Sequence, residues 1–183
     1  MEKFDILPRT KDSLVSSHKD FMKKYNGLID EVLYYSERTE DGRWVIPIEV
    51  DWDYTLTKCS SWETGEMVLN EEAFEIMRRW TKDYNVGWIL NSMRHDEILK
   101  EPLETLEKEG IKLYGLRKNP CQDKDGNSVT KSFSIFCIDD RNVGVPVKWF
   151  EDCNRPHVDW VEVDKIMSPI LKHISDNLDK VKL

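Results

Sequence analysis

Short apolar runs alternate with longer amphipathic stretches along most of this chain, and this alternation constrains the fold more than any other feature. The runs cover residues 44–50, 86–90, 111–116 and 133–138. Helices are expected over Glu71–Tyr84, in a stretch that closes at Gly110, and from Asp164 or Pro169 to Leu178. Strands that alternate with helices in this way predict a layered α/β fold with a mainly parallel central sheet.

Two prolines set expected element boundaries. Pro47 lies in the first apolar run, and proline cannot donate a hydrogen bond to a sheet, so the core strand is expected to begin near Ile48. Pro102 is expected in the first turn of the second helix, where a missing N–H is harmless.

The N-terminal region, residues 1–43, is expected to be a helical extension of a core that spans residues 44–183. Between Lys11 and Tyr35 apolar side chains recur at steps of three and four, as in an amphipathic helix. Asn26-Gly27 could divide this helix in two. Its apolar face either packs on its own core or forms a partner surface, and a homodimer through this helix is one such partner.

Composition places the chain among globular proteins and narrows its partners. Hydrophobic residues make up 39% of the 183 residues, which excludes a disordered class. The net charge of −8 disfavours a surface that neutralises nucleic-acid phosphates. No apolar run approaches the roughly 20 residues that span a bilayer, and no secretory signal follows Met1. We expect a soluble, cytoplasmic protein with no membrane partner.

The four cysteines lie far apart, at positions 59, 121, 137 and 153. No close pair predicts a zinc site or a redox dithiol. Reduced structural thiols are therefore expected, with two disulfides in a secreted protein as the alternative.

Three of the apolar runs end in reactive polar side chains. These are Asp51 and Asp53 after the first run, Ser92 after the second, and Asp139 and Asp140 after the fourth. Ligands of open parallel sheets bind beyond the carboxyl ends of the strands, so these side chains are expected at one site. Four carboxylates would repel one another there unless a cation offset their charge, and an oxygen-rich site suits Mg²⁺.

The spacing of Asp51 and Asp53 indicates phosphate chemistry. Both side chains can face one site only if the chain leaves strand geometry at Trp52. One carboxylate could then attack phosphorus and form an aspartyl-phosphate, while the other protonates the leaving oxygen and later activates water.

Several groups near this pair are candidates for holding the phosphoryl group. They are the loop backbone at Trp52, Tyr54 and Thr55, the Ser92 hydroxyl and the Lys131 ammonium. Asn91 and Arg94, beside Ser92, are candidate substrate contacts, and a capping or surface role fits Arg94 equally well. Each of these residues alone has an ordinary structural interpretation, as a strand end, a helix cap or a surface side chain. Their order along successive strands is what favours a catalytic site.

Taken in order, these residues resemble the four motifs of the haloacid dehalogenase-like superfamily of phosphohydrolases. The matching segments are Asp51-Trp52-Asp53-Tyr54-Thr55-Leu56, Leu90-Asn91-Ser92-Met93-Arg94, Lys131 and Ile138-Asp139-Asp140-Arg141. The resemblance covers residues 45–147 and implies a Rossmann-like three-layer sandwich. Aspartate at both positions of the first motif implies phosphate transfer rather than dehalogenation. Many relatives have Gly where Tyr54 stands, which implies a narrowed entrance here.

The resemblance also implies a role for each carboxylate. Asp51 would be the nucleophile and a metal ligand. Asp53 would be the acid/base and would bind the metal through its backbone carbonyl. Asp139 and Asp140 would complete the metal site, directly or through water. Thr55 would buttress the loop.

An open site is implied as well. Thr57–Leu69 and Leu116–Thr130 are too short for the folded cap that many relatives insert at these places. Capless relatives often act on bulky substrates or borrow a lid from a partner, and the N-terminal helix is the candidate lid. The segment Pro156–Trp160 is a candidate border of the entrance.

These observations predict a magnesium-dependent phosphatase that hydrolyses a phosphomonoester, on a small molecule or a bulkier substrate, through an aspartyl-phosphate. One alternative keeps the intermediate but uses another acceptor, or acts on nucleotides or nucleic-acid ends, since Asp139-Asp140-Arg141 also resembles deoxyribonucleotidases of the superfamily. Another is a catalytically silent binding protein with the same fold.

Overall fold

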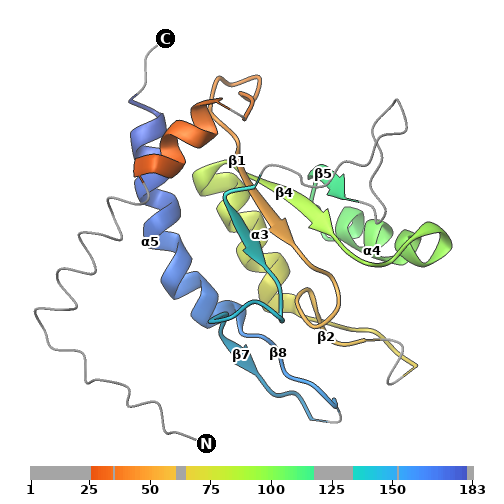
Figure 1. Cartoon of the computed structure of the whole chain (residues 1–183). Helices are drawn as coiled ribbons and strands as arrows, with labels where there is room; N and C mark the ends of the chain where they lie inside the picture. The colour runs from red at the N-terminus through yellow and green to blue at the C-terminus, as the bar shows by residue number, and fades with distance from the viewer. Residues whose placement is uncertain (1–25, 35, 61–64, 118–133, 152, 181–183) are drawn as a thin grey trace, which may run out of the picture.

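A four-stranded parallel sheet lies at the centre of the structure, which is a computed structural model (Figure 1). Its strands are β1 (Ile46–Val50), β4 (Val86–Asn91), β5 (Leu113–Arg117) and β6 (Phe136–Ile138), in the order β5-β4-β1-β6. β1 pairs in parallel with β4 on one side and with β6 on the other. The predicted α/β, Rossmann-like fold with a mainly parallel central sheet is confirmed.

The structure describes residues 26–34, 36–60, 65–117, 134–151 and 153–180. In the N-terminal region, residues 26–34 are helical, and Val32 is fully buried in the same hydrophobic core as the sheet. The apolar repeat from Leu14 to Tyr25 and the candidate phosphate ligand Lys131 lie outside the described residues.

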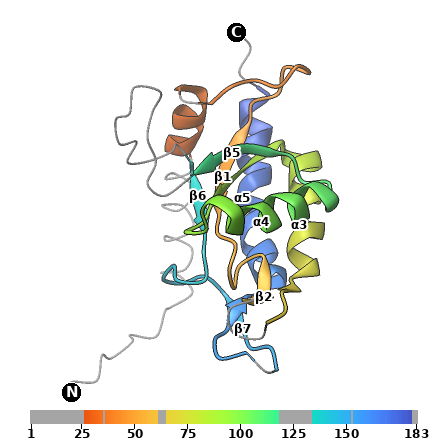
Figure 2. The ribbon, with the colours of Figure 1, turned by 90° about the vertical axis from the view of Figure 1, so that its right-hand side faces the viewer.

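Three longer helices pack on one face of the sheet. They are α3 (Glu71–Tyr84), α4 (Asp96–Lys108) and α5 (Trp160–Leu178). Figure 2 shows all three on the same side of the strands. Among the described residues, no helix is both long and apolar enough to cross a membrane.

A cluster of three tryptophans joins α3, β4 and α5. Trp80 and Trp88 stack with ring centroids 5.9 Å apart, and Trp160 packs against them at 6.1 and 6.2 Å. Trp80 Nε1 donates a hydrogen bond to Asp164, and Trp160 Nε1 donates one to the Thr55 carbonyl, both at 2.8 Å. The second bond ties the core directly to the loop that follows β1.

β1 begins at Ile46, so the start expected near Ile48 is wrong. The Pro47 carbonyl accepts a hydrogen bond from the Ile135 N–H at 3.0 Å. In a parallel strand the N and C=O of one residue face the same neighbouring strand. The missing N–H of Pro47 therefore faces the side of β6, just ahead of its first residue, and the pairing of β1 with β4 loses nothing.

Two helix boundaries also differ from expectation. α5 begins at Trp160, earlier than either predicted start, because Asp159 caps it by accepting the Glu162 N–H at 3.3 Å. Pro102 lies beyond the first turn of α4, which begins at Asp96. Periodicity locates these helices but does not fix their first residues, since α5 starts at a side-chain cap and α4 starts without one.

Two small antiparallel hairpins, which the sequence did not predict, lie beyond the carboxyl end of the sheet (Figure 1). They pair β2 (Thr57–Cys59) with β3 (Val68–Leu69), and β7 (Val147–Lys148) with β8 (His157–Val158). Each contains strands of only two or three residues, too short to show a periodic pattern.

A disulfide between Cys59 and Cys153 connects the two hairpins. The two cysteines are 94 residues apart in sequence, but their Cα atoms are 5.8 Å apart. The expectation of reduced thiols is therefore wrong for this pair, because the topology brings together cysteines that lie far apart along the chain. Cys137 is a free, exposed thiol.

Candidate functional site

The chain leaves strand geometry directly after β1. The Trp52 carbonyl accepts a turn hydrogen bond from the Leu56 N–H at 2.9 Å, and the Trp52 side chain is fully buried. Tyr54 has a φ of 58°, a left-handed conformation that few residues other than glycine adopt. The predicted departure at Trp52 is confirmed, and it lets the side chains of Asp51 and Asp53 take directions that a strand would not allow.

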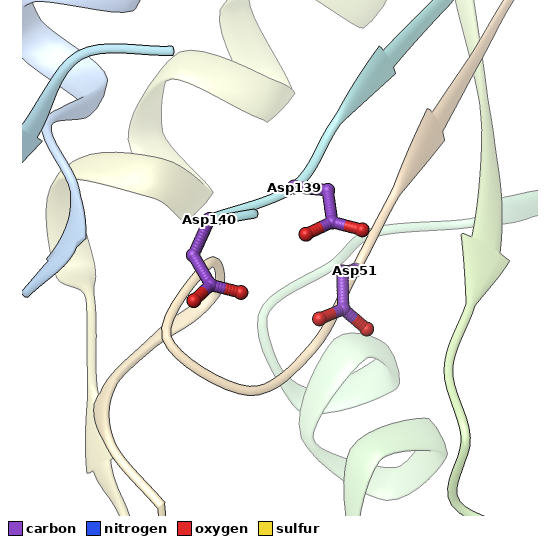
Figure 3. Close-up of side chains that lie close together, drawn as sticks. All are labelled: Asp51, Asp139 and Asp140. Atoms are coloured by element: carbon purple, nitrogen blue, oxygen red, sulfur yellow. The ribbon is translucent and has the colours of Figure 1, made fainter. Parts of the chain in front are cut away.

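Three carboxylates meet at the carboxyl end of the sheet (Figure 3). Asp51 follows β1, and Asp139 and Asp140 follow the neighbouring strand β6. Each residue offers one carboxylate oxygen, and these three oxygens lie within 4.8 Å of one another. Parallel pairing of β1 with β6 thus brings together three of the predicted site residues.

Burial and mutual repulsion perturb the carboxyl group of Asp51. Its pKa is raised from 3.8 to about 7, chiefly because the group is buried. A hydrogen bond from the Trp52 N–H lowers the pKa, and the charges of Asp139, Asp53 and Asp140 raise it. Burial also raises the pKa of Asp140. A cation placed among these groups would favour their ionised forms.

The donor set of this cluster fits a hard divalent cation. It consists entirely of carboxylate oxygens, which are the ligands that Mg²⁺ and Ca²⁺ prefer. The cluster of Asp51, Asp139 and Asp140 could therefore hold a metal ion. Asp53 was predicted to bind the metal through its backbone carbonyl. Its side chain is not a member of the cluster.

Arg94 holds Asp53 apart from the other carboxylates. Arg94 Nε donates to Asp53 Oδ2 at 3.0 Å, and Nη2 donates to Oδ1 at 2.8 Å, which makes the pair bidentate. Arg94 Nη1 donates to Glu101 at 3.0 Å. Only 5% of the Arg94 side chain is exposed, against 25% for Asp53. Arg94, a candidate substrate contact, is directed at Asp53 in this structure.

Asp140 has an arginine partner of its own, on the opposite side of the cluster. Arg155 Nη2 donates to Asp140 Oδ2, and the Arg155 guanidinium lies over the Tyr54 ring, 4.4 Å from its centroid. The Asp140 N–H donates to Thr55 Oγ1 at 3.1 Å. Thr55 therefore buttresses the loop, as the sequence implied, by linking it to the residues that follow β6.

Ser92 lies where the sequence predicted, directly after β4. It is buried, and its Oγ accepts a hydrogen bond from the Arg94 N–H at 3.1 Å. A hydroxyl that accepts one hydrogen bond keeps its own proton to donate. Asn91 is the last residue of β4 and is half-buried.

The backbone N–H groups expected to bind phosphate are engaged within the loop. The Tyr54 N–H donates to Thr57 Oγ1 at 3.1 Å, and the Thr55 N–H is directed at the Trp52 carbonyl at 3.4 Å. The Trp52 N–H hydrogen-bonds to the Asp51 carboxylate. These bonds fix the conformation of the loop, and its role in binding phosphate stays a prediction.

Arg155 is the site residue that sequence reasoning missed. It lies directly before the segment Pro156–Trp160, which the sequence marked as a candidate border of the entrance. Its contact with Asp140 depends on the β7–β8 hairpin, which has no periodic signature. Lys131, in contrast, was predicted but lies outside the described part of the chain.

A solved structure of a conserved protein from Bacteroides thetaiotaomicron is similar to this one. The two align with a TM-score of 0.51 and 22% sequence identity, over 68% of this chain and 91% of that chain. A likeness at this identity shows the α/β fold alone. No family model and no curated protein matches the sequence.

Proposed function

We propose that this protein is a magnesium-dependent phosphatase, of the capless haloacid dehalogenase-like type, that hydrolyses phosphomonoesters through an aspartyl-phosphate on Asp51. The observation that supports this most is the division of four carboxylates into two sets. Asp51, Asp139 and Asp140 meet at one point, while Asp53 is held apart by Arg94. A site for metal alone has no need of the fourth carboxylate, whereas phosphate transfer needs both a nucleophile and a separate acid/base.

In the first half of the reaction, an Asp51 oxygen would attack phosphorus and displace the substrate's leaving oxygen. Asp53 would give its proton to that oxygen as the P–O bond breaks. In the second half, water would attack the phosphorus of the aspartyl-phosphate, Asp53 would take a proton from the water, and phosphate would leave Asp51. Arg94 would act as a positioning residue, because its bidentate grip fixes the Asp53 carboxylate.

Mg²⁺ bound by Asp51, Asp139 and Asp140 would supply charge stabilisation for the phosphoryl oxygens. Thr55 would keep this site in shape, since its hydroxyl accepts the Asp140 N–H. The Ser92 hydroxyl, buried beside the loop, would donate a hydrogen bond to the phosphoryl group. Lys131 is proposed from the sequence motif as the cationic partner of Ser92.

The substrate is proposed to be a phosphorylated small molecule or a bulkier phosphoester. The cytoplasmic location and the homodimer through the N-terminal helix stay predictions. Val32, at the end of the apolar repeat, is buried in the chain's own core, which supports the packing alternative for that part of the helix. Cell fractionation would test the location, because a disulfide such as Cys59–Cys153 is typical of oxidising compartments.

The proposal can be tested with a panel of phosphomonoesters that includes p-nitrophenyl phosphate, each assayed with Mg²⁺ and with EDTA. Hydrolysis is expected with Mg²⁺ and not with EDTA, and Asp51→Asn is expected to abolish it while the protein stays folded. If folded, metal-loaded wild-type protein hydrolyses no member of the panel, the binding-protein alternative is favoured instead.

A further inference from the structure

The β7–β8 hairpin borders the candidate site and is fastened to it at several points. The Cys59–Cys153 disulfide holds the hairpin loop, and the Val158 N–H of β8 donates to the Tyr54 carbonyl at 2.8 Å. The loop also bears exposed aromatic side chains, with Trp149 70% and Phe150 36% exposed. A capless site lacks an inserted domain to recognise its substrate, and this hairpin is a fixed element in a position to do so.

Arg155 is the residue of this hairpin that reaches the carboxylate cluster. Its guanidinium is held from two directions, by the hydrogen bond to Asp140 and by the ring of Tyr54. Stacking on a ring fixes the plane of a guanidinium and leaves the N–H groups at its edge free to bind oxyanions. Arg155 is thus held in a defined place rather than free in solvent.

Most of the hydrogen-bonding capacity of Arg155 remains unused by the described residues. A guanidinium has five N–H donors, and within the described ranges the Arg155 side chain donates through Nη2 to Asp140. Its side chain is 35% exposed, whereas the Arg94 side chain is 5% exposed and has carboxylate partners on three of its nitrogens. Arg94 is closed off by the protein, and Arg155 is open to a ligand.

Arg155 and Ser92, the proposed phosphoryl ligand, lie on different sides of the candidate site. Ser92 follows β4, and Asp140 follows β6, so the two residues lie on opposite sides of β1 in the strand order. Arg155 approaches from the β6 side, with Asp140. A second cation lies beside this hairpin, because Nζ of Lys58, a residue of β2, is 5.4 Å from the centroid of the Phe150 ring.

We infer that Arg155 is a specificity-determining residue that binds a second oxyanion of the substrate, distinct from the phosphoryl group that is transferred. The preferred substrates are then phosphomonoesters that carry a further carboxylate or phosphate. This inference rests on the proposed phosphatase function. It assigns to the hairpin the recognition role that a cap has in larger relatives.

The test compares matched substrates that differ in the second anion. Glycerol 3-phosphate against 3-phosphoglycerate adds a carboxylate, and fructose 6-phosphate against fructose 1,6-bisphosphate adds a phosphate. The wild-type protein is expected to favour the more anionic member of at least one pair by about 10- to 100-fold in kcat/KM, chiefly through KM, as for one charge-assisted hydrogen bond. The pair that shows the preference identifies which oxyanion is bound.

Arg155→Gln is expected to reduce this preference to nearly one, and Arg155→Lys to retain part of it. Any damage to the metal site affects both members of a pair, so the ratio isolates recognition. Arg141→Gln is the matched control, since Arg141 is an exposed cation directly after Asp140, and the preference should persist in it. An unchanged preference in Arg155→Gln, or none in the wild type, overturns the inference.

Binding measurements separate this inference from the proposed function. The Asp51→Asn protein, which should not hydrolyse substrate, is titrated calorimetrically with the same four compounds. The same titrations are made with the double variant that also carries Arg155→Gln. Binding that depends on Arg155 in a protein whose wild type hydrolyses nothing would refute the phosphatase and keep the anion site. Hydrolysis that does not depend on Arg155 would support the phosphatase and refute the anion site.

Discussion

Two arginine–aspartate pairs flank the Asp51 loop, and they differ in what holds them. Arg94 follows β4 and grips Asp53 through two hydrogen bonds, almost wholly out of contact with solvent. Arg155 belongs to a hairpin fastened by a disulfide, and it contacts Asp140 while a third of its side chain stays exposed. Both residues of the first pair follow strands of the parallel sheet. In the second pair, Arg155 comes from a hairpin outside that sheet.

This difference indicates a division of labour within one site. A buried, bidentate partner fixes the direction of a carboxylate, as an acid/base requires. An exposed partner at the edge of the cluster is accessible to ligands and is easier to change without altering the fold. Variants of the two pairs should therefore fail in different ways.

The largest difference is expected between Asp53→Asn and Asp140→Asn. Loss of Asp53, the proposed acid/base, should lower kcat by about 10²- to 10⁴-fold and leave the Mg²⁺ dependence unchanged. Loss of Asp140 should instead raise the Mg²⁺ concentration needed for half-maximal activity by about tenfold or more. The measurement is kcat for p-nitrophenyl phosphate as a function of Mg²⁺ concentration. An equal shift in Mg²⁺ dependence in both variants would contradict the assignment of different roles to Asp53 and Asp140.

Removal of the Cys59–Cys153 disulfide is expected to have the next largest effect, on stability. Replacing both Cys59 and Cys153 by Ser opens a loop that spans 94 residues and is expected to lower the free energy of unfolding by about 3 kcal/mol. Denaturant unfolding of the double variant measures this, with Cys137→Ser, a free and exposed thiol, as the control. A double variant as stable as the wild type would show that the hairpin is held without the disulfide.

The two arginines should differ in their contribution to stability. Arg94→Ala removes a guanidinium that is only 5% exposed and leaves Asp53, which is 25% exposed, without its bidentate partner, so a loss of about 2 kcal/mol is expected. Arg155→Ala removes a guanidinium that is 35% exposed from beside Asp140, which is 5% exposed, and should cost about 1 kcal/mol. Urea unfolding curves of both variants test this order. The reverse order would mean that the hairpin pair, not the sheet pair, is structural.

The last prediction concerns the dependence of stability on pH in the absence of metal. The pKa of Asp51 is raised to about 7 in the folded protein, above its ordinary value of 3.8. Between these values the folded state binds more protons than the unfolded state, so stability should fall as pH rises through this window. Thermal unfolding in EDTA measures the trend. Asp51→Asn should flatten it, and a profile unchanged by that substitution would exclude Asp51 as its source.

The sequence predicted the sheet and the residues at its strand ends, but not the side-chain contacts between segments that lie far apart along the chain. Alternating apolar runs predicted the sheet, and the strand ends predicted the meeting of Asp51 with Asp139 and Asp140, because parallel strands share a carboxyl edge. The partner of Arg94 was not predictable, since spacing along a chain does not show which carboxylate a buried guanidinium faces. Pro47 misled the strand boundary because sequence does not show which neighbour an N–H faces.

The hairpin and its contacts were beyond the reach of sequence patterns. Cys59 and Cys153 are 94 residues apart, and Arg155 meets Asp140 only because the β7–β8 hairpin folds back beside the Asp51 loop. Strands of two residues carry no detectable alternation. The core of the candidate site was thus visible in the sequence, and its border was not.

The most direct test of the central claim is whether Asp51 accepts a phosphoryl group. Beryllofluoride mimics a phosphoryl group bound to a carboxylate, and bound fluoride is observable by ¹⁹F NMR without knowledge of the substrate. A Mg²⁺-dependent bound signal is expected in the wild type and in Asp53→Asn, and it should be absent in Asp51→Asn. No signal in folded, metal-loaded wild-type protein, or an equal signal in Asp51→Asn, would contradict the assignment of Asp51 as the nucleophile.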